Sequence, residues 1–280
     1  MPESYGANGL TALVHIEALT ALLAPSGLNL MGVVAPETWD VHAPPARKAG
    51  VLLPGAQAIV VIGNGGGSLW KAFVADLAEH PEHLCNEPHP LDAFVRRSVQ
   101  RADAALGASP RRWFYAAATE SVHLDFRVLG WLAGFGSRSR LGLLLHPRYG
   151  SWVGLRAACL LGASVPAHVS LAPDLCAGCM APCVASCPGA AFPGGQWEVE
   201  RCAAFKRASD TCLSSCAARD TCPAGAGHRY PELAVAYHSH RASGRRKLAE
   251  ALGHPLKADL FPADGSDWDN WRGKIDVRGE

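Results

Sequence analysis

The feature that most constrains this 280-residue chain is a cluster of cysteines, because eight of the ten cysteines lie between positions 176 and 222. Their pattern is C-x2-C-x3-C-x3-C-P, then a lone cysteine, then C-x3-C-x5-C-P. A chain this long can build a hydrophobic core without disulfide staples, so the cluster favours metal binding. Small residues and prolines fill the same stretch, which is typical of a segment organised around its ligands.

Eight thiolates are the number that two 4Fe-4S clusters require. In two-cluster ferredoxins the last cysteine of each run binds the other cluster. That rule would place one cluster on Cys176, Cys179, Cys183 and Cys222, and the second on Cys187, Cys202, Cys212 and Cys216. Ferredoxins usually have the first run C-x2-C-x2-C-x3-C-P, and here one gap of that run is a residue longer, as is the loop before Cys222. A single cluster, zinc bound by four cysteines and a redox disulfide system therefore stay open.

Charge and hydropathy exclude several classes of function. Lys plus Arg number 26 against 25 for Asp plus Glu, so the net charge of +1 provides no field for a phosphate backbone or an anionic membrane surface. No stretch has the apolar length of a membrane span, and the sequence MPESYGANGL lacks the pattern of a secretory signal. We expect a cytoplasmic protein that binds no nucleic acid and has no membrane span.

Hydrophobic periodicity predicts a mixture of helices and strands. Helical spacing covers 9–23, 91–106 and 231–252, whereas 30–35, 58–62 and 139–145 have the composition of strands. The regular pattern stops near Pro166, and the tail from Ala263 is irregular. We therefore predict an α+β chain with a first domain over 1–172, a ferredoxin-like iron-sulfur module over 173–227, and a C-terminal helix and tail over 228–280 that pack on the first domain.

A glycine-rich bend over 63–68 follows one predicted strand and precedes a helix. Its third glycine position holds Ser68 and no acidic partner follows at the expected distance, so it is a poor dinucleotide-binding loop. A close approach of the backbone to a large ligand or to a neighbouring strand explains the glycines better.

The stretch His146-Pro147-Arg148-Tyr149-Gly150-Ser151-Trp152-Val153-Gly154-Leu155-Arg156 resembles the HPRFGGWFAIR stretch of the CblC-type cobalamin-processing proteins. The resemblance continues in 89–92, before a helix, and from Ala236-Tyr237 to Arg245 and Leu248. It covers most of the chain at low identity. That family has no cysteine module at the position where this chain carries one.

A second family carries such a module. Gly150-Ser151-Trp152, the following 160–162 and 165–166, and Cys176-Ala177-Gly178-Cys179 are similar in order and spacing to epoxyqueuosine reductase, as is Leu129-Gly130-Trp131. The lone cysteine of that enzyme's eight-cysteine module is matched by Cys202. Its V-D-S-A-P-like segment, which holds a proton-donating aspartate, is missing from 115–121, and no basic tRNA-binding repeat domain is found. These differences disfavour queuosine synthesis.

The two resemblances imply a cobalamin-binding domain of the flavin-reductase-like nitroreductase type, with the clusters beside the corrin. They also imply which residues contact cobalamin: Gly130, Trp131, His146, Arg148, Tyr149, Gly150, Ser151, Trp152, Arg156 and Arg245. Arg156 and Arg245 align with arginines that help CblC proteins bind glutathione. The segment 130–154 has the glycine, leucine and serine content that suits a large, mostly apolar corrin with polar amides at its rim.

The resulting hypothesis is a cobalamin-binding oxidoreductase, or reductase. Two 4Fe-4S clusters would pass electrons from an external donor, such as a ferredoxin or flavodoxin, to the cobalt of cobalamin (vitamin B12) and so reduce it or remove its upper ligand. Three alternatives stay open: corrinoid-dependent reduction of an organic substrate, a non-catalytic corrinoid carrier with structural clusters, and a zinc-stapled interaction protein.

Overall fold

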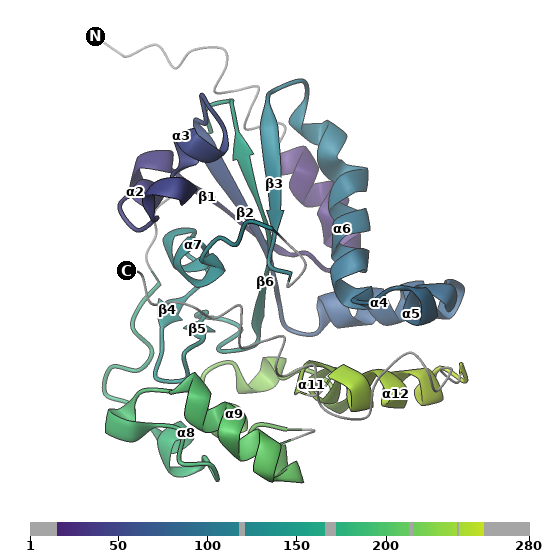
Figure 1. Cartoon of the computed structure of the whole chain (residues 1–280), viewed down its shortest axis with the longest axis vertical. Coiled ribbons are helices and arrows are strands. Elements are labelled where there is room, and N and C mark those ends of the chain that lie inside the picture. Colours follow the sequence, from purple (N-terminus) through teal and green to yellow (C-terminus); the bar gives the residue numbers. More distant parts are fainter. Residues whose placement is uncertain (1–15, 118–120, 166–171, 213–214, 240, 255–280) are drawn as a thin grey trace.

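A four-stranded sheet forms the centre of the computed structural model, which describes residues 16–117, 121–165, 172–212, 215–239 and 241–254. Its strands run in the order β1-β2-β6-β3, with every neighbouring pair antiparallel (Figure 1). Their bounds are β1 (Leu30–Val34), β2 (Ala58–Gly65), β3 (Arg111–Tyr115) and β6 (Val153–Leu161). The strands predicted over 30–35 and 58–62 are confirmed, whereas β3 and β6 were not predicted.

Helices cover both faces of the sheet (Figure 1). Successive residues of β2 point to opposite faces, so Val60 and Ile62 join one apolar core while Ile59 and Val61 join the other. The first core includes side chains of the helical residues 16–23, α4 (Ser68–Glu79), α5 (Glu82–Asn86), α6 (Pro90–Ala102) and the 3-10 turn η3 (Asp103–Leu106). The second includes side chains of α2 (Pro36–Asp40), α3 (Ala49–Leu52) and α7 (Phe126–Leu132). Two further 3-10 turns are η1 (Ala24–Ser26) and η2 (Pro45–Arg47).

The strand predicted over 139–145 is wrong. The chain forms a small hairpin there, in which β4 (Ser137–Arg138) pairs with β5 (Leu144–Leu145). The hydroxyl of Ser139 donates to the carbonyl of Leu143 at 2.7 Å, and Gly142 turns with a φ of +69°. A Cβ on Gly142 would lie 2.5 Å from the Trp197 ring. The turn residues in the middle of the apolar run therefore reverse the chain.

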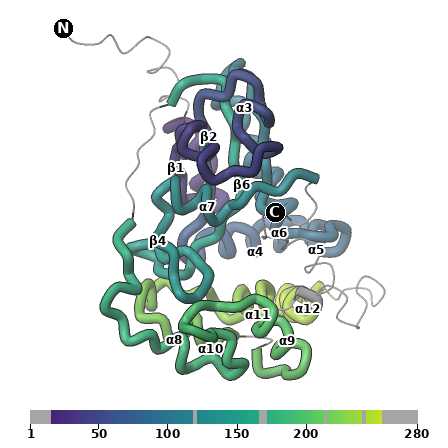
Figure 2. The backbone as a smooth tube through the Cα atoms, turned by 60° about the vertical axis from the view of Figure 1, so that its left-hand side comes forward, coloured from purple at the N-terminus to yellow at the C-terminus, as the bar shows by residue number. Residues whose placement is uncertain are grey.

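The cysteine segment consists of short helices: α8 (Pro182–Ala185), η4 (Pro193–Gly195), α9 (Val199–Ala208), η5 (Asp210–Cys212), α10 (Ala217–Asp220) and η6 (Ala226–His228). They lie at one end of the molecule, next to the β4–β5 hairpin (Figures 1 and 2). Cys183, Cys222 and Phe192 form a third apolar cluster with Leu141 and Leu145 of the hairpin. This segment thus shares a small core with the sheet domain.

The helix predicted over 231–252 is two helices, α11 (Glu232–Ser239) and α12 (Arg241–Ala251). They cross closely, since a Cβ on Gly244 would lie 2.4 Å from the Tyr237 backbone. Tyr237 and Leu248 join the first core. The predicted irregular tail and the start of the first predicted helix lie outside the described residues. Among the described helices, none has both the length and the apolar character needed to cross a membrane.

Close backbone approach explains the glycine-rich bend, as expected. The register between β2 and β6 shifts at Gly63, where an added Cβ would lie 2.7 Å from the carbonyl oxygen of Gly154. A Cβ on Gly65 would lie 2.2 Å from the Tyr149 ring. The bend therefore brings the 146–152 loop onto the end of β2.

Asp103 anchors the start of β3. Its carboxylate accepts two hydrogen bonds from Arg111, at 2.8 and 2.6 Å, and one from the indole of Trp113 at 2.7 Å. The Arg111 hydrogen bonds are the largest cause that lowers the pKa of Asp103. The ionised form is therefore favoured in the folded protein, so this stabilisation is complete above the ordinary carboxyl pKa and declines as pH falls through it.

We expect Asp103→Asn to lower the free energy of unfolding at pH 7 by about 1–2 kcal/mol, because a neutral amide replaces a charged acceptor. The loss should begin to shrink as pH falls below about 4, where the carboxylate of the unfolded chain takes up a proton, and should disappear at lower pH, where the folded carboxylate is also protonated. Urea unfolding of both proteins across this range measures the difference. A constant difference at every pH would contradict the assigned role.

Candidate functional site

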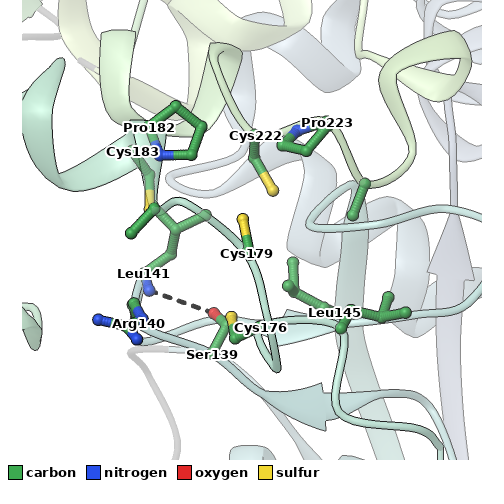
Figure 3. Close-up of a pocket in the computed structure, with 13 residues that line it drawn as sticks. Ser139, Arg140, Leu141, Leu145, Cys176, Cys179, Pro182, Cys183, Cys222 and Pro223 are labelled. Carbon is green, nitrogen blue, oxygen red and sulfur yellow. Dashed lines mark hydrogen bonds between the residues drawn. The ribbon is translucent and has the colours of Figure 1, made fainter.

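Four cysteines line one hollow: Cys176, Cys179, Cys183 and Cys222. Figure 3 shows the sulfur atoms of Cys179 and Cys222 directed toward each other across it. The hollow contains about 380 Å³ of empty space, part of it open to solvent, and its opposite wall is the β4–β5 hairpin. Two cysteine runs far apart in the sequence thus supply side chains to one place.

The other four cysteines of the segment form a second group. Burial is the largest cause that raises the pKa of Cys202 and Cys212, and the charges of Cys187 and Cys216 raise it further. A hydrogen bond from Trp197 acts in the opposite direction on Cys202. In the first group, burial raises the pKa of Cys183 and Cys222 in the same way. The two spatial groups coincide with the groups expected from the ferredoxin rule, and the ligand roles remain predictions.

All-thiolate groups suit iron-sulfur clusters and zinc alike. Within the described ranges, no three His, Cys, Asp or Glu side chains converge on a position for a single metal ion. Ligands of a 4Fe-4S cluster need no such convergence, because each thiolate binds a different iron atom. Because burial raises the pKa of Cys183, Cys202, Cys212 and Cys222, these four thiols stay protonated and metal binding to them would release protons.

The 146–152 loop begins with a tight bridge in which His146 and Gly150 exchange backbone hydrogen bonds of 2.9 and 2.8 Å. The Nδ1 atom of His146 accepts from the backbone N–H groups of Arg148 and Tyr149, at 3.0 and 3.3 Å. Burial first, and then the charges of Arg148 and His228, lower the pKa of His146. The neutral imidazole therefore shapes the loop by accepting these hydrogen bonds.

This loop contacts the cysteine segment backbone to backbone. A Cβ on Gly150, whose φ is +55°, would lie 1.9 Å from the carbonyl oxygen of Ala224. A Cβ on Gly225 would lie 2.2 Å from the Tyr149 backbone. Ala224 and Gly225 lie two and three residues after Cys222, so the first cysteine group lies next to the loop. Gly150 is a packing position between the two segments.

Arg219 reinforces this contact and was not identified from the sequence. Its Nη2 donates to the carbonyl of Ser151 at 2.7 Å, and its Nε donates to the Ser151 hydroxyl at 3.4 Å. The guanidinium carbon lies 4.1 Å from the centre of the Trp152 ring and 5.2 Å from that of Tyr230. Its position between Cys216 and Cys222 was the only signal in the sequence.

A second hollow adjoins the loop and is lined by Asn64, Gly66, Leu69, Trp70, Leu91, Arg156, Tyr230 and His238. Asn64 is 1% exposed and accepts from Nε of Arg156 at 2.8 Å. Its amide donates to the Tyr230 hydroxyl at 3.4 Å. Sequence reasoning identified Arg156 but missed Asn64 and Tyr230, because residues this far apart give no local pattern.

Three other predicted cobalamin contacts lie elsewhere. Arg245 is 3% exposed and donates to the backbone carbonyls of Leu84 and Pro88, so its guanidinium holds the α5–α6 connection. Gly130 packs within the second core, where an added Cβ would lie 2.5 Å from Leu155. Trp131 lies beside Arg138, whose guanidinium carbon is 4.5 Å from its ring centre. The structure brings His146, Arg148, Tyr149, Gly150, Ser151 and Trp152 together in one loop, with Arg156 on β6 behind them.

Comparison with known proteins supports the fold. No family model matches the chain, and no curated protein matches its sequence. The solved structures with a similar fold include an epoxyqueuosine reductase with an epoxyqueuosine-modified tRNA stem loop (16% identity, TM-score 0.55, 85% of this chain and 75% of that one). They also include the epoxyqueuosine reductase of Bacillus subtilis (18%, 0.54, 94% and 86%) and the B12-trafficking protein CblC of C. elegans (12%, 0.54, 89% and 100%).

These neighbours belong to the two families that the sequence resembles. At such low identity they establish a shared mixed helix-and-sheet fold, and the iron-sulfur module remains a prediction. One neighbour was solved with a tRNA stem loop, so the comparison gives no support to the expectation that nucleic acid is not a partner.

The His146 geometry predicts a pH-dependent loop. Because the folded protein lowers the pKa of His146 below 6.5, the folded state binds fewer protons and loses stability as pH falls below about 6.5. Asparagine can accept the same local hydrogen bonds without titrating. Between pH 7.5 and pH 5.5, the Tm of His146→Asn should therefore fall by about 2 °C less than that of the parent. Identical pH profiles in calorimetry would contradict this role of His146.

A second prediction tests the contact between the loop and the cysteine segment. Gly55→Ala should cost about 1–2 kcal/mol, because Gly55 has a φ of +78° and open space around it. Gly150→Ala should cost about 3 kcal/mol or more, because the same backbone strain adds to a collision with Ala224. Limited proteolysis should also cut the cysteine segment faster in Gly150→Ala. Equal losses in denaturant unfolding would refute close packing at Gly150.

Proposed function

We propose that this chain is a cobalamin-binding iron-sulfur reductase. Two 4Fe-4S clusters, one on each cysteine group, pass electrons from an external ferredoxin-like or flavodoxin-like donor to corrinoid cobalt, which is reduced or loses its upper ligand. The observation that carries this proposal is the direct contact of the cysteine segment with the 146–152 loop, through Gly150, Ala224 and Arg219. The resemblance assigns this loop to the corrin.

Contacts continue from the second cysteine group to the second hollow. Cys216 interacts electrostatically with Arg219, which contacts Tyr230, and Tyr230 accepts from Asn64, the partner of Arg156. These groups form a chain of neighbours from the cysteine segment to the hollow. A short, packed path between two redox sites suits electron transfer.

The chemistry of the hollow suits a corrin rim. Trp152 contacts the hollow's Tyr230 and is 1% exposed, and its indole N–H has no acceptor among the described residues, so an acceptor that enters with the ligand would satisfy it. The hollow contains about 220 Å³ of empty space, part of it open to solvent, and the enclosed part is far too small for a corrin. Corrin binding therefore requires the side chains at its edge, Trp70, Tyr230 and His238, to move.

Each part of the chain then has a role. When bound, the corrinoid supplies redox chemistry at cobalt. Arg156, oriented by Asn64, places positive charge at the edge of the hollow. The buried Trp152 and the aromatic Tyr230 exclude water between the cysteine segment and the hollow.

Anaerobic purification followed by cobalamin titration tests the proposal. The parent should contain about eight iron atoms per chain and should reduce added cobalamin with dithionite or a flavodoxin as donor, without a thiol. Cys179→Ala combined with Cys216→Ala removes one ligand from each group, so it should bind cobalamin and lose at least 90% of this reduction rate. Cys85→Ala is the matched control and should behave like the parent, because Cys85 lies outside both groups.

Four results would overturn the proposal. Zinc without iron would refute the clusters. Equal reduction rates in the parent and the double variant, or a strict need for glutathione, would refute electron delivery by the clusters. A brown protein that binds cobalamin and never reduces it would indicate a carrier with structural clusters.

A further inference from the structure

Arg219 is a cation without an anionic side-chain partner among the described residues. Its side chain donates to the carbonyl and the hydroxyl of Ser151 and forms a further hydrogen bond with Tyr230, and its guanidinium lies over the rings of Trp152 and Tyr230. Other arginines of the chain do form ion pairs, such as Arg111 with Asp103 and Arg201 with Glu198. Arg219 therefore lies in a site that is built for a guanidinium, and the adjacent carboxylate of Asp220 acts on its charge without an ion pair among the described residues.

The missing ion pair matters because the charge of Arg219 is partly buried. Desolvation lowers the pKa of Arg219, whereas Tyr230, Cys216 and Asp220 act in the opposite direction. A partly buried charge is unfavourable unless nearby negative charge offsets it. Ring faces and one carbonyl supply only part of that compensation.

Cys216 is the one of these three charged neighbours that belongs to a cysteine group. It lies three residues before Arg219, on the same turn, where the N–H of Asp220 donates to the Cys216 carbonyl at 2.9 Å. Side chains three residues apart on a helical turn are neighbours. A 4Fe-4S cluster with four thiolate ligands carries net negative charge and becomes more negative when it gains an electron.

We infer that Arg219 sets the reduction potential of the cluster on Cys187, Cys202, Cys212 and Cys216. A fixed positive charge beside a cluster stabilises the reduced form more than the oxidised form, and so raises the potential. Arginine suits this position because its planar group stacks on two rings while donating to Ser151, which fixes the distance of the charge. This inference rests on the proposed function, since it requires the second cluster.

Redox titration of the iron-loaded protein with dithionite, followed by electron paramagnetic resonance, tests the inference. Each step adds one electron to a cluster and breaks no bond. Arg219→Met keeps the length of the side chain and removes its charge. This variant should lower the equilibrium constant for reduction of the second-group cluster at least tenfold, which corresponds to 59 mV for a one-electron couple. The potential of the first-group cluster should stay unchanged. Arg219→Lys should shift the second-group potential less.

Arg229→Met is the matched control. Arg229 is exposed and donates to the carbonyl of Asp220, so the loss of its solvated charge should leave both potentials unchanged. If Arg219→Met loses iron, Ser151→Asp provides the second test. It keeps Arg219 and places a counter-charge beside it, so it should lower the same potential.

The outcomes separate this inference from the proposed function. A parent without iron would overturn both. If the parent contains two clusters and Arg219→Met leaves both potentials unchanged, the role of Arg219 is refuted and the proposed function stays intact. Where Arg219→Met loses iron, unchanged potentials in Ser151→Asp lead to the same conclusion. An equal shift in Arg229→Met would also refute it, because a general change of surface charge would then explain the result.

Discussion

The contact of Gly150 with Ala224 and Gly225 is the constraint on which the candidate site depends. Two backbones approach each other there with no room for a side chain on either glycine. This approach orients the segment that ends at Cys222 against the loop that begins at His146, and it lets Arg219 reach Ser151. The cysteine groups, the loop and the second hollow therefore form one continuous structure at the end of the sheet.

Three arginines at this end of the molecule differ in the groups that surround their guanidinium in place of water, and these surroundings indicate their roles. Arg245 donates to the carbonyls of Leu84 and Pro88, which is typical of a residue that holds a fold together. Arg156 is held by the amide oxygen of Asn64 at the edge of a hollow. Arg219 lies between ring faces and lacks a carboxylate partner among the described residues. Of these three, Arg156 and Arg219 have positive charge available for a bound group.

The candidate site was partly predictable from the sequence. The spacing of the cysteines gave the two spatial groups, and the glycine-rich bend indicated a close approach that the structure attributes to Gly154 and Tyr149. Prediction failed where local composition opposed the final geometry. Strand β3 begins with two consecutive arginines, Arg111 and Arg112, so its sequence does not resemble a buried strand. The apolar run over 139–145 contains Gly142, which packs against Trp197, and the run folds there into a hairpin.

The sequence by itself determined the strands β1 and β2, the division of the cysteines into two sets and the loop that resembles cobalamin-processing proteins. Those features are local, because hydrophobic period, ligand spacing and turn residues act over a few positions. Only the tertiary structure decided that Asn64, Arg156, Arg219 and Tyr230 meet beside Trp152. Their contacts join four distant segments, and such contacts depend on how the sheet, the cysteine segment and α11 pack, which no local pattern encodes.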